Sequence, residues 1–438
     1  MDLTNITPQT KILILGFARE GQSTYKFLRS KFPEIPLSLA DIKTPDWVPS
    51  DPHVECFFGP DYLNCLSQFD LCIKSPGISP HQPEIVAAKK SGLKFSSHTR
   101  LFFEVCPSHN IIGISGTKGK STTTSLTYEV LKANGLDAVL VGNIGRPALD
   151  FLPEISPHTW VVMELSSYQL QDLNISPHIA VMQNIFPDHL DYHKTFEEYI
   201  EAKSHLVRFQ TPNDYVIFNS DFPLPTQIAH TSPGKKISYS LLDFDPQIKT
   251  KLIGNHNKLN IIPVVKISEL LQLSQKITYS AIENFTPLDT RLQCVGNVNG
   301  IMFYEDTLAT IPEATIAAID ALHPTVGTLI AGGHERKQNY SVLAKKILES
   351  GINTLIVFPV TGPRIWTEIT TIKQNPNLTY HYSETMSDAV KFALDHTASG
   401  KIVLLSPAAP SFTLFKDYRD ESQQYRQAIN LLRQDSQS

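Results

Sequence analysis

Short apolar runs alternate with amphipathic stretches along almost the whole chain. Most runs end in a glycine, an acid or a polar turn, and a stretch with helical spacing usually follows. Strands that alternate with helices in this way are typical of parallel sheets covered by helices. The pattern therefore predicts an α/β protein with doubly wound sheets. Ligands of such sheets bind at the carboxyl ends of the strands.

The expected elements extend over the full sequence. A strand, a tight turn and a helix start are predicted over 11–23, and another strand begins at Ile111. The other strands are expected at 37–41, 70–75, 138–142, 160–166, 179–184, 300–306, 328–333, 353–358 and 401–406. Helices are expected at 120–133, 195–209, from the segment 252–260 through 271, and at 312–322, 341–350, 364–371, 386–395 and 414–433. Residues 220–249 are only weakly patterned.

The chain of 438 residues suggests about three domains, at roughly 150 residues each. We expect a Rossmann-like N-terminal domain at 1–108, a central P-loop ATPase domain at 109–287 and a Rossmann-like C-terminal domain at 288–438. A net charge of −5 without a basic block argues against nucleic acid as a partner. No apolar run approaches the ~18 residues of a membrane span, and the N-terminus does not resemble a signal peptide.

The five cysteines show no CxxC spacing. They are expected to be reduced, mostly buried thiols of a cytosolic protein, and they are Cys56, Cys65, Cys72, Cys106 and Cys294.

The strongest local signal is a glycine-rich turn between the run at Ile111 and the predicted helix at 120–133. Gly116 and Gly119 allow the backbone to bend around a ligand. Lys120 can reach the outer phosphates of a nucleotide, and the Ser121 hydroxyl suits Mg²⁺. Helix N-termini favour anions, so the segment predicts a nucleoside triphosphate site. The alternative is a chance Gly/Lys-rich turn, since the position of the first glycine in a strict P-loop is occupied by Ile114.

The segment 11–23 approximates a dinucleotide-binding fingerprint, but Ala18 replaces its second glycine. Asp41 ends the next strand, where an acid usually binds a ribose. The turn 75–77 is expected at the same edge of the sheet. The alternative is a purely structural βαβ unit without a ligand.

In the predicted central sheet, Glu164 and the pair Asp188–His189 follow strands and should meet the glycine-rich turn in one crevice. Glu164 and His189 are donors suited to Mg²⁺ or Mn²⁺ beside phosphates. For His189 the alternative is a hydrogen-bonded loop histidine. Five further residues have ordinary alternatives: solvated or supporting positions for Asp191 and His193, a helix-surface position for Lys203, and helix capping for the asparagines at 257 and 260.

Six motifs now support a family resemblance. They are GTKGKST at 116–122, GNIG at 142–145, ELSSYQ at 164–169, NIFPDHLD at 184–191, GNHNKLN at 254–260 and SPAAPSFTLFK at 406–416. With these motifs, and with Lys203 fourteen residues beyond His189, the chain resembles the Mur ligases, most closely their glutamate-adding branch. The resemblance covers nearly the whole chain and implies a cytoplasmic, monomeric ATP-dependent ligase of peptidoglycan synthesis. Its substrates would be a UDP-N-acetylmuramoyl-peptide and glutamate, with Mg²⁺ or Mn²⁺.

The resemblance also implies residue roles. The catalytic residues would be Lys120, His189 and Lys203, with Lys203 carbamylated by CO₂. The metal ligands would be Ser121, Glu164, His189 and the carbamate of Lys203. ATP would be bound by Gly116, Thr117, Lys118, Gly119, Lys120, Ser121, Thr122, Asn257, Asn260, Arg291 and Asp306. The UDP-muramoyl substrate would be bound by Gly16, Ser23, Asp41, Ser75, Pro76, Gly77, Asn143 and Ser166. Further substrate contacts would come from Thr310, Arg336, Ser411, Phe412 and Tyr418.

Several positions depart from the family pattern. A usual lysine is Leu308, another is Arg336 with Lys337 beside it, and a usual Arg-Gly pair reads Glu421-Ser422. These changes alter the cations expected near a dicarboxylic substrate, and arginine does not replace lysine neutrally. The alternatives are therefore the L-glutamate-adding branch of the family and a nucleotide- or UDP-sugar-binding protein with a decayed acceptor pocket. A P-loop kinase or NTPase is a further rival.

Overall fold

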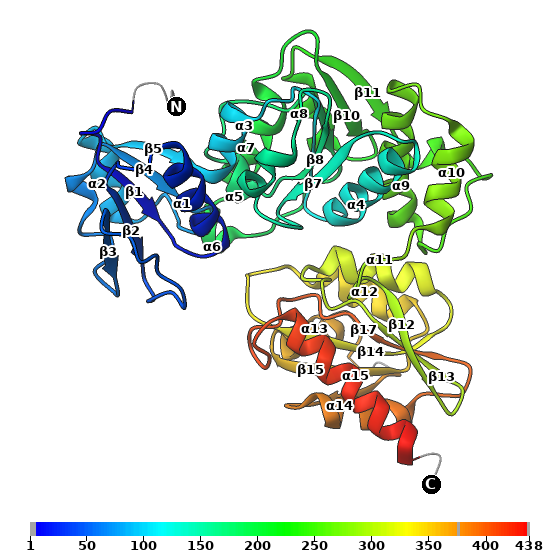
Figure 1. Cartoon of the computed structure of the whole chain (residues 1–438). Helices are drawn as coiled ribbons and strands as arrows, with labels where there is room; N and C mark the ends of the chain where they lie inside the picture. Colours follow the sequence, from blue (N-terminus) through cyan, green and yellow to red (C-terminus); the bar gives the residue numbers. More distant parts are fainter. Residues whose placement is uncertain (1–5, 375–376, 436–438) are drawn as a thin grey trace. The chain divides into compact units, whose positions relative to one another are not determined.

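The computed structural model describes residues 6–374 and 377–435 (Figure 1). The chain forms two compact units. The first contains the residues up to 245 together with 260–282, and the second contains 246–259 together with the residues from 283 onward. Each unit is described by itself.

The first sheet of the first unit is fully parallel, with the order β3-β2-β1-β4-β5. Its inner strands are continuous apolar runs that are buried on both faces, which is typical of parallel sheets. The strands are β1 (Ile12–Leu15), β2 (Leu37–Asp41), β3 (Val54–Phe58), β4 (Leu71–Lys74) and β5 (Lys94–Ser97), and the helices are α1 (Arg19–Lys31), α2 (Pro83–Lys90) and α3 (His98–Val105). The predicted strands at 12–15, 37–41 and 70–75 are confirmed, whereas the two edge strands β3 and β5 were not predicted.

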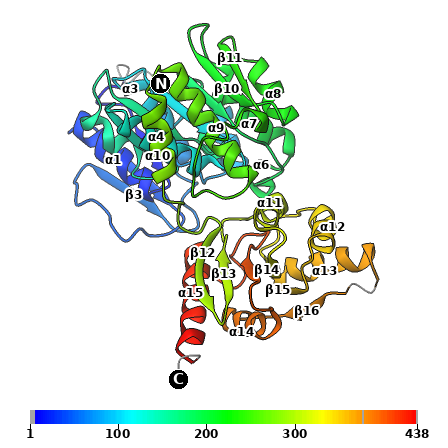
Figure 2. The ribbon, with the colours of Figure 1, turned by 90° about the vertical axis from the view of Figure 1, so that its right-hand side faces the viewer.

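The second sheet of this unit is also parallel, with the order β11-β10-β9-β6-β8-β7. Its strands are β6 (Ile111–Ser115), β7 (Ala138–Gly142), β8 (Trp160–Glu164), β9 (Ile179–Met182), β10 (Tyr215–Asn219) and β11 (Lys235–Tyr239). The helices are α4 (Lys120–Ala133), α5 (Ser167–Leu170), α6 (Leu190–His193), α7 (Phe196–Arg208), α8 (Pro223–His230), α9 (Asn255–Leu270) and α10 (Gln275–Asn284). Helices α4, α9 and α10 lie beside one another (Figure 2), and the Asn134 side chain at the end of α4 bonds Ser274 and Thr278 next to and within α10.

The second unit contains a mixed sheet with the order β12-β13-β17-β14-β15-β16. Only β12 is antiparallel to its neighbour. The strands are β12 (Gln293–Val298), β13 (Ile301–Glu305), β14 (Val326–Gly333), β15 (Thr354–Val360), β16 (Thr379–Tyr382) and β17 (Ile402–Leu405). The helices are α11 (Pro312–Leu322), α12 (Ser341–Glu349), α13 (Thr361–Ile372), α14 (Met386–His396) and α15 (Tyr418–Asp435). The four predicted strands and five predicted helices of this region are present, and β12 and β16 are additional.

Two expectations need correction. The weakly patterned segment 220–249 contains helix α8 and strand β11, and β10 directly precedes it. The cysteines are not mostly buried: Cys65 and Cys72 are buried, Cys106 is half-buried, and Cys56 and Cys294 are exposed. Both exposed cysteines lie on edge strands, whose outer positions face water.

Helix α15 lies along the edge of the sheet formed by β12 and β13 (Figure 2). Two glutamates are buried at this contact, Glu305 of β13 and Glu421 of α15. Glu305 accepts hydrogen bonds from Ser422 Oγ (2.8 Å) and Arg426 Nε (3.0 Å). Glu421 is 0% exposed, and neither of its carboxylate oxygens has a hydrogen-bond partner. Burial raises the pKa of Glu421 well above its usual value, and the charges of Glu305 and Asp420 raise it further. Ionisation of Glu421 is therefore disfavoured inside the second unit.

We predict that Glu421→Gln makes the second unit more stable at neutral and alkaline pH. Because the pKa of Glu421 is raised on folding, its carboxyl favours folding below its unfolded pKa, and this contribution is lost as the pH rises through the folded pKa. Glutamine cannot ionise, so the gain at pH 8 should be about 1.4 kcal/mol for each pH unit over which the folded state keeps Glu421 protonated and the unfolded state does not, and it should shrink at pH 5. Calorimetric unfolding at both pH values measures it.

Glu384→Gln is the matched control, because Glu384 is an exposed glutamate of the same unit. The free energy of unfolding of Glu384→Gln should change between the two pH values as it does in the wild type. A Glu421→Gln variant that is less stable than the wild type at pH 8 would contradict the interpretation.

Candidate active site

The glycine-rich loop lies between β6 and α4, as the sequence predicts. Gly119 is the N-cap of α4 and has a φ of +87°, a conformation that glycine adopts without strain. A Cβ atom at Gly119 would lie 2.1 Å from Asn260 Oδ1, so the loop requires glycine for space as well. The loop leads directly into the N-terminal N–H groups of a fourteen-residue helix, which is a favourable site for phosphate.

The segment after β9 holds the loop in place. Asn184 clamps Lys118: its Oδ1 accepts from the Lys118 N–H (2.8 Å), and its Nδ2 donates to the Lys118 carbonyl (3.0 Å). The Thr117 N–H donates to the Asn184 carbonyl (2.7 Å), and the Thr117 hydroxyl accepts from the Phe186 N–H (2.9 Å). These four hydrogen bonds fix one turn, which preorganises its backbone for a ligand.

Two lysines of the loop supply positive charge. Lys120 Nζ donates to the Thr117 carbonyl (2.8 Å), and Lys118 Nζ lies 3.6 Å from Asp188 Oδ2. The Asp188 side chain is 2% exposed and also accepts from the N–H of His189 (2.9 Å). The two lysines therefore place positive charge in the loop, next to the segment that carries His189.

Lys203 is the least expected member of the site. The alternative of a helix-surface lysine is wrong, because its side chain is 1% exposed and lies under the loop. Its Nζ donates to the Gly116 carbonyl (2.7 Å) and to Ser115 Oγ (3.2 Å). Burial lowers the pKa of the Lys203 amine well below its usual value, Lys120 and Lys118 lower it further, and Asp188 and Glu164 oppose the shift. Lys203 therefore lies close enough to Glu164, Asp188 and the loop lysines to be affected by their charges.

Glu164 ends β8 beside the loop and is 1% exposed. Its Oε1 accepts from Asn143 Nδ2 (2.9 Å), while its Oε2 is buried without a partner. An orphaned carboxylate oxygen in such a position fits a hard cation such as Mg²⁺ or Mn²⁺. Within the described residues, no three His, Cys, Asp or Glu side chains form a complete ion site. A divalent ion here would therefore take further ligands from phosphate oxygens.

His189 has left-handed backbone geometry (φ 57°) at the N-cap of α6. Its Nδ1 is 2.7 Å from the Tyr168 hydroxyl, and its Nε2 is 3.7 Å from Asp188 Oδ2. Of the two neighbours, Asp191 is exposed. His193 is not solvated, since it is 0% exposed and its Nε2 lies 3.0 Å from Ser167 Oγ.

The capping alternative for Asn257 and Asn260 is wrong, because α9 begins at Asn255 and both lie inside it. Asn260 is held in the first unit, where its Oδ1 accepts from Gln183 Nε2 (3.0 Å) and its carbonyl accepts from Thr123 Oγ1 (2.9 Å). Asn257 belongs to the second unit and donates to the Ile253 carbonyl (2.8 Å).

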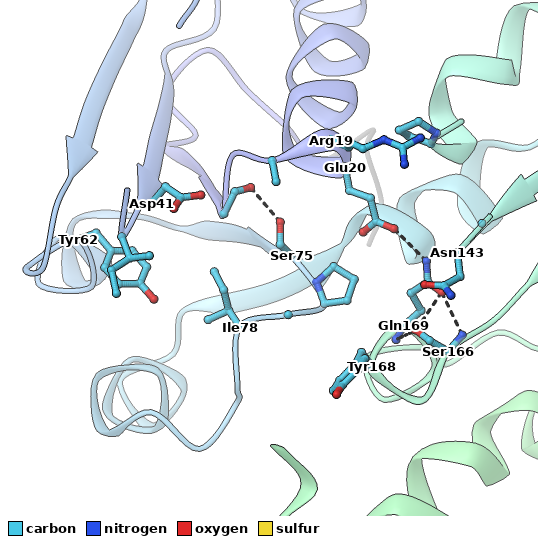
Figure 3. A pocket seen from close by; sticks show the side chains of 17 residues that line it. Arg19, Glu20, Asp41, Tyr62, Ser75, Ile78, Asn143, Ser166, Tyr168 and Gln169 are labelled. Atoms are coloured by element: carbon cyan, nitrogen blue, oxygen red, sulfur yellow. Dashed lines mark hydrogen bonds between the residues drawn. The ribbon is translucent and has the colours of Figure 1, made fainter. Parts of the chain in front are cut away.

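A pocket of about 480 Å³ lies at the carboxyl edge of the first sheet (Figure 3). Its other wall comes from segments that follow β7 and β8 of the second sheet. The predicted residues that line it are Gly16, Asp41, Ser75, Pro76, Gly77, Asn143 and Ser166. Ser23 is not among the lining residues, and its hydroxyl donates to Asp150 Oδ1 (2.6 Å) instead.

Arg19 and Glu20 also line the pocket and belong to the segment 16–23 that was expected at the UDP site, whereas Tyr62, Tyr168 and Gln169 were not predicted. Gln169 Nε2 donates to Glu20 Oε1 (2.9 Å) across the pocket (Figure 3). Burial raises the pKa of Glu20, against the smaller lowering effects of Gln169, Arg19 and Lys74. The motif at 164–169 is the only signal that could have indicated Tyr168 and Gln169 in advance.

The remaining predicted residues lie in the second unit. Arg291 stands near His256, whose pKa is lowered to about 4 by burial and further by the Arg291 charge, and Asp306 Oδ1 accepts from the Leu292 N–H (3.2 Å). The others follow β13, β14 and β17, which are neighbours in the sheet, and they are Thr310, Arg336, Ser411, Phe412 and Tyr418. The loops after β14 and β17 are joined by the N–H of His334, which donates to the Pro410 carbonyl (2.7 Å). The exposed Phe412 ring packs edge-on against the His334 ring, with 6.3 Å between the two ring centroids.

Comparison with known proteins extends the picture to the whole chain. The sequence matches the MurD-like N-terminal domain of Mur ligases over residues 10–97, the Mur ligase middle domain over 114–272 and the glutamate ligase domain of Mur ligases over 290–409. It is 32% identical over 399 residues to a UDP-N-acetylmuramoylalanine--D-glutamate ligase from Acetivibrio thermocellus, with 85% of each chain covered. The corresponding ligase from Clostridium kluyveri is 31% identical over 454 residues, with 96% of each chain covered.

Solved structures share the fold. The UDP-N-acetylmuramate-alanine ligase MurC from Thermotoga maritima has a TM-score of 0.59 at 17% identity, covering 97% of this chain and 100% of its own. MurF from Acinetobacter baumannii has a TM-score of 0.60 at 15% identity, covering 93% and 92%. The chain belongs to the Mur ligase family. It is an ATP-dependent, amide-forming ligase. None of the described helices is long and apolar enough to cross a membrane.

We predict that Gly119→Ala raises the KM for ATP at least ten-fold, because the new methyl group would displace Asn260 or the loop backbone. Gly135→Ala is the matched control: Gly135 also has a positive φ of +80°, but its Cβ would meet no atom within 4 Å. The control should lose about 1–2 kcal/mol of stability through backbone strain and keep its KM for ATP. Steady-state kinetics and thermal unfolding of both variants measure the difference, and an unchanged KM in Gly119→Ala would show that the loop tolerates a side chain.

Proposed function

We propose that this chain adds D-glutamate to UDP-N-acetylmuramoyl-L-alanine with hydrolysis of ATP to ADP and phosphate. The observation that carries the proposal is the position of Asn143. Its side chain lines the substrate pocket and also donates to Glu164 beside the phosphate loop. The pocket for the acceptor and the predicted site for ATP therefore share one wall, as a reaction between them requires.

The proposed reaction runs through an acyl phosphate. A carboxylate oxygen of the acceptor's alanine attacks the γ-phosphorus of ATP, and ADP leaves. The amine of glutamate then attacks the acyl carbon, and phosphate leaves as the amide forms. The loop lysines Lys118 and Lys120 and the N–H groups of α4 would stabilise the charge on the transferring phosphoryl group.

A divalent ion would be held by Glu164, Ser121 and His189. Glu164 supports this assignment through its buried, unpartnered oxygen. When bound, Mg²⁺ neutralises phosphate charge and polarises the group that is transferred. Lys120 and the loop backbone orient the same phosphates independently of the ion.

We further propose that Lys203 carries a carbamate. An amine that is neutral, buried and held by two hydrogen bonds can attack CO₂, forming the N–C bond with release of one proton. The product replaces a cation under the phosphate loop with an anion, which suits a site that also receives a divalent ion.

We expect protein equilibrated with ¹³C-bicarbonate to show one carbamate signal by NMR that disappears in Lys203→Arg. Lys74→Arg is the matched control. Lys74 is equally buried, but its Nζ forms an ion pair with Asp172 Oδ2 at 3.0 Å. The Lys74→Arg control should retain the carbamate signal. The activity of the wild-type enzyme should fall in CO₂-depleted buffer and recover when bicarbonate is added. A signal that survives in Lys203→Arg would reject the assignment.

We place the glutamate site at the loops after β14 and β17, which carry the cations Arg336 and Lys337 and the hydroxyl of Ser411. Leu308 is half-buried and supplies no charge where the family has a lysine. The reaction is proposed to occur in the cytoplasm with the protein as a monomer.

We predict phosphate release and a matching gain in product mass with ATP, Mg²⁺, UDP-N-acetylmuramoyl-L-alanine and D-glutamate, and little with L-glutamate. Preference for L-glutamate would retain the mechanism and assign the chain to the other branch. Reactions without any amino acid are the control. Release that does not depend on an amino acid would favour a nucleotide-binding protein or an NTPase instead.

A further inference from the structure

Tyr168 connects the substrate pocket with the histidine proposed as a metal ligand. It follows β8 on the short helix α5 and lines the pocket (Figure 3). Its hydroxyl is 2.7 Å from Nδ1 of His189. One side chain therefore contacts both the acceptor pocket and the candidate metal site.

The ring of Tyr168 is fixed by its neighbours. It stacks on His193 with ring centroids 5.6 Å apart, and it meets the rings of Tyr192 and His189 edge-on at 4.3 and 4.9 Å. His193 is in turn held by Ser167. A ring confined in this way cannot change rotamer without disturbing helix α6, whose N-cap is His189, so its hydroxyl occupies a defined position.

The hydrogen bond determines how His189 can act. A neutral imidazole has one N–H and one lone pair, and the partner of one nitrogen fixes what the other presents. If Nδ1 donates its proton to the Tyr168 oxygen, the lone pair lies on Nε2, where an ion can bind. Without the hydroxyl the ring could rotate or adopt the other tautomer.

We propose that Tyr168 is a positioning residue that orients His189 through Nδ1 so that Nε2 is presented to the divalent ion. The inference rests on the proposed role of His189 as a ligand. Partners of this kind typically change metal affinity or activity 10–100-fold when they are removed. Tyr168 itself does not contact the reacting atoms in this proposal.

The neighbouring Tyr192 provides a matched control. Its hydroxyl donates to the carbonyls of Pro76 (2.8 Å) and Ile78 (3.2 Å) in the pocket turn. Tyr192→Phe removes a hydroxyl from the same aromatic cluster but leaves the bond between Tyr168 and His189. The two variants therefore separate an effect on the metal from a general effect on packing.

The experiment measures Mn²⁺ binding by electron paramagnetic resonance with a non-hydrolysable ATP analogue present. We expect Tyr168→Phe to weaken Mn²⁺ binding about ten-fold or more and to lower kcat, with the KM for UDP-N-acetylmuramoyl-L-alanine changed less than about three-fold. Tyr192→Phe should raise that KM and leave Mn²⁺ binding within about two-fold of the wild type.

His189→Ala distinguishes the two ways in which the result can fail. If His189→Ala weakens Mn²⁺ binding and Tyr168→Phe does not, the positioning role is wrong while the ligand assignment stands. If neither variant changes Mn²⁺ binding, the ligand assignment itself is wrong. Equal losses in Tyr168→Phe and Tyr192→Phe would show that only the packing of the cluster matters, and would also reject the inference.

Discussion

The active-site region depends on one buried amine. Lys203 lies under the phosphate loop with its Nζ bonded to the Gly116 carbonyl and Ser115 Oγ. An unpaired ammonium ion in such a place would cost several kcal/mol, so the amine must be neutral, paired or chemically modified. Helix α7, strand β6 and the loop therefore have to be arranged together around this side chain, and the charges of Glu164, Asp188 and Lys120 all act on it.

The same region contains charged groups that are suited to bind charged ligands. Lys118 and Lys120 stand in the loop, while Glu164 keeps one carboxylate oxygen buried without a partner. A polyphosphate satisfies the lysines and the helix N-terminus, and a divalent ion satisfies the carboxylate. Each ligand makes the other easier to bind, because each supplies the counter-charge that its partner needs.

The sequence was most informative where a buried strand ends in a polar motif. The strands before Gly116, Glu164 and Asp41 were all found, because continuous apolar runs are required in the middle of a parallel sheet. Edge strands such as β3 and β16 lack that requirement, so their patterns are weak. The burial of Lys203 and His193, the Gln183–Asn260 contact and the bond from Tyr168 to His189 depend on residues distant in sequence, which periodicity cannot show. For some of these positions the family motifs were the sole indication in the sequence.

The first sheet shows why a dinucleotide-like sequence does not imply a dinucleotide ligand. Asp41 ends β2, where a ribose partner is expected, but its Oδ2 accepts from the Phe17 N–H (2.7 Å) and its Oδ1 from the Lys43 N–H (3.0 Å). Much of its capacity is thus used to shape the turns around it. The far wall of the pocket comes from the second sheet, through Asn143, Ser166 and Gln169. A ligand that fills this pocket therefore extends from the turns of the first sheet to the segments that follow β7 and β8 of the second sheet.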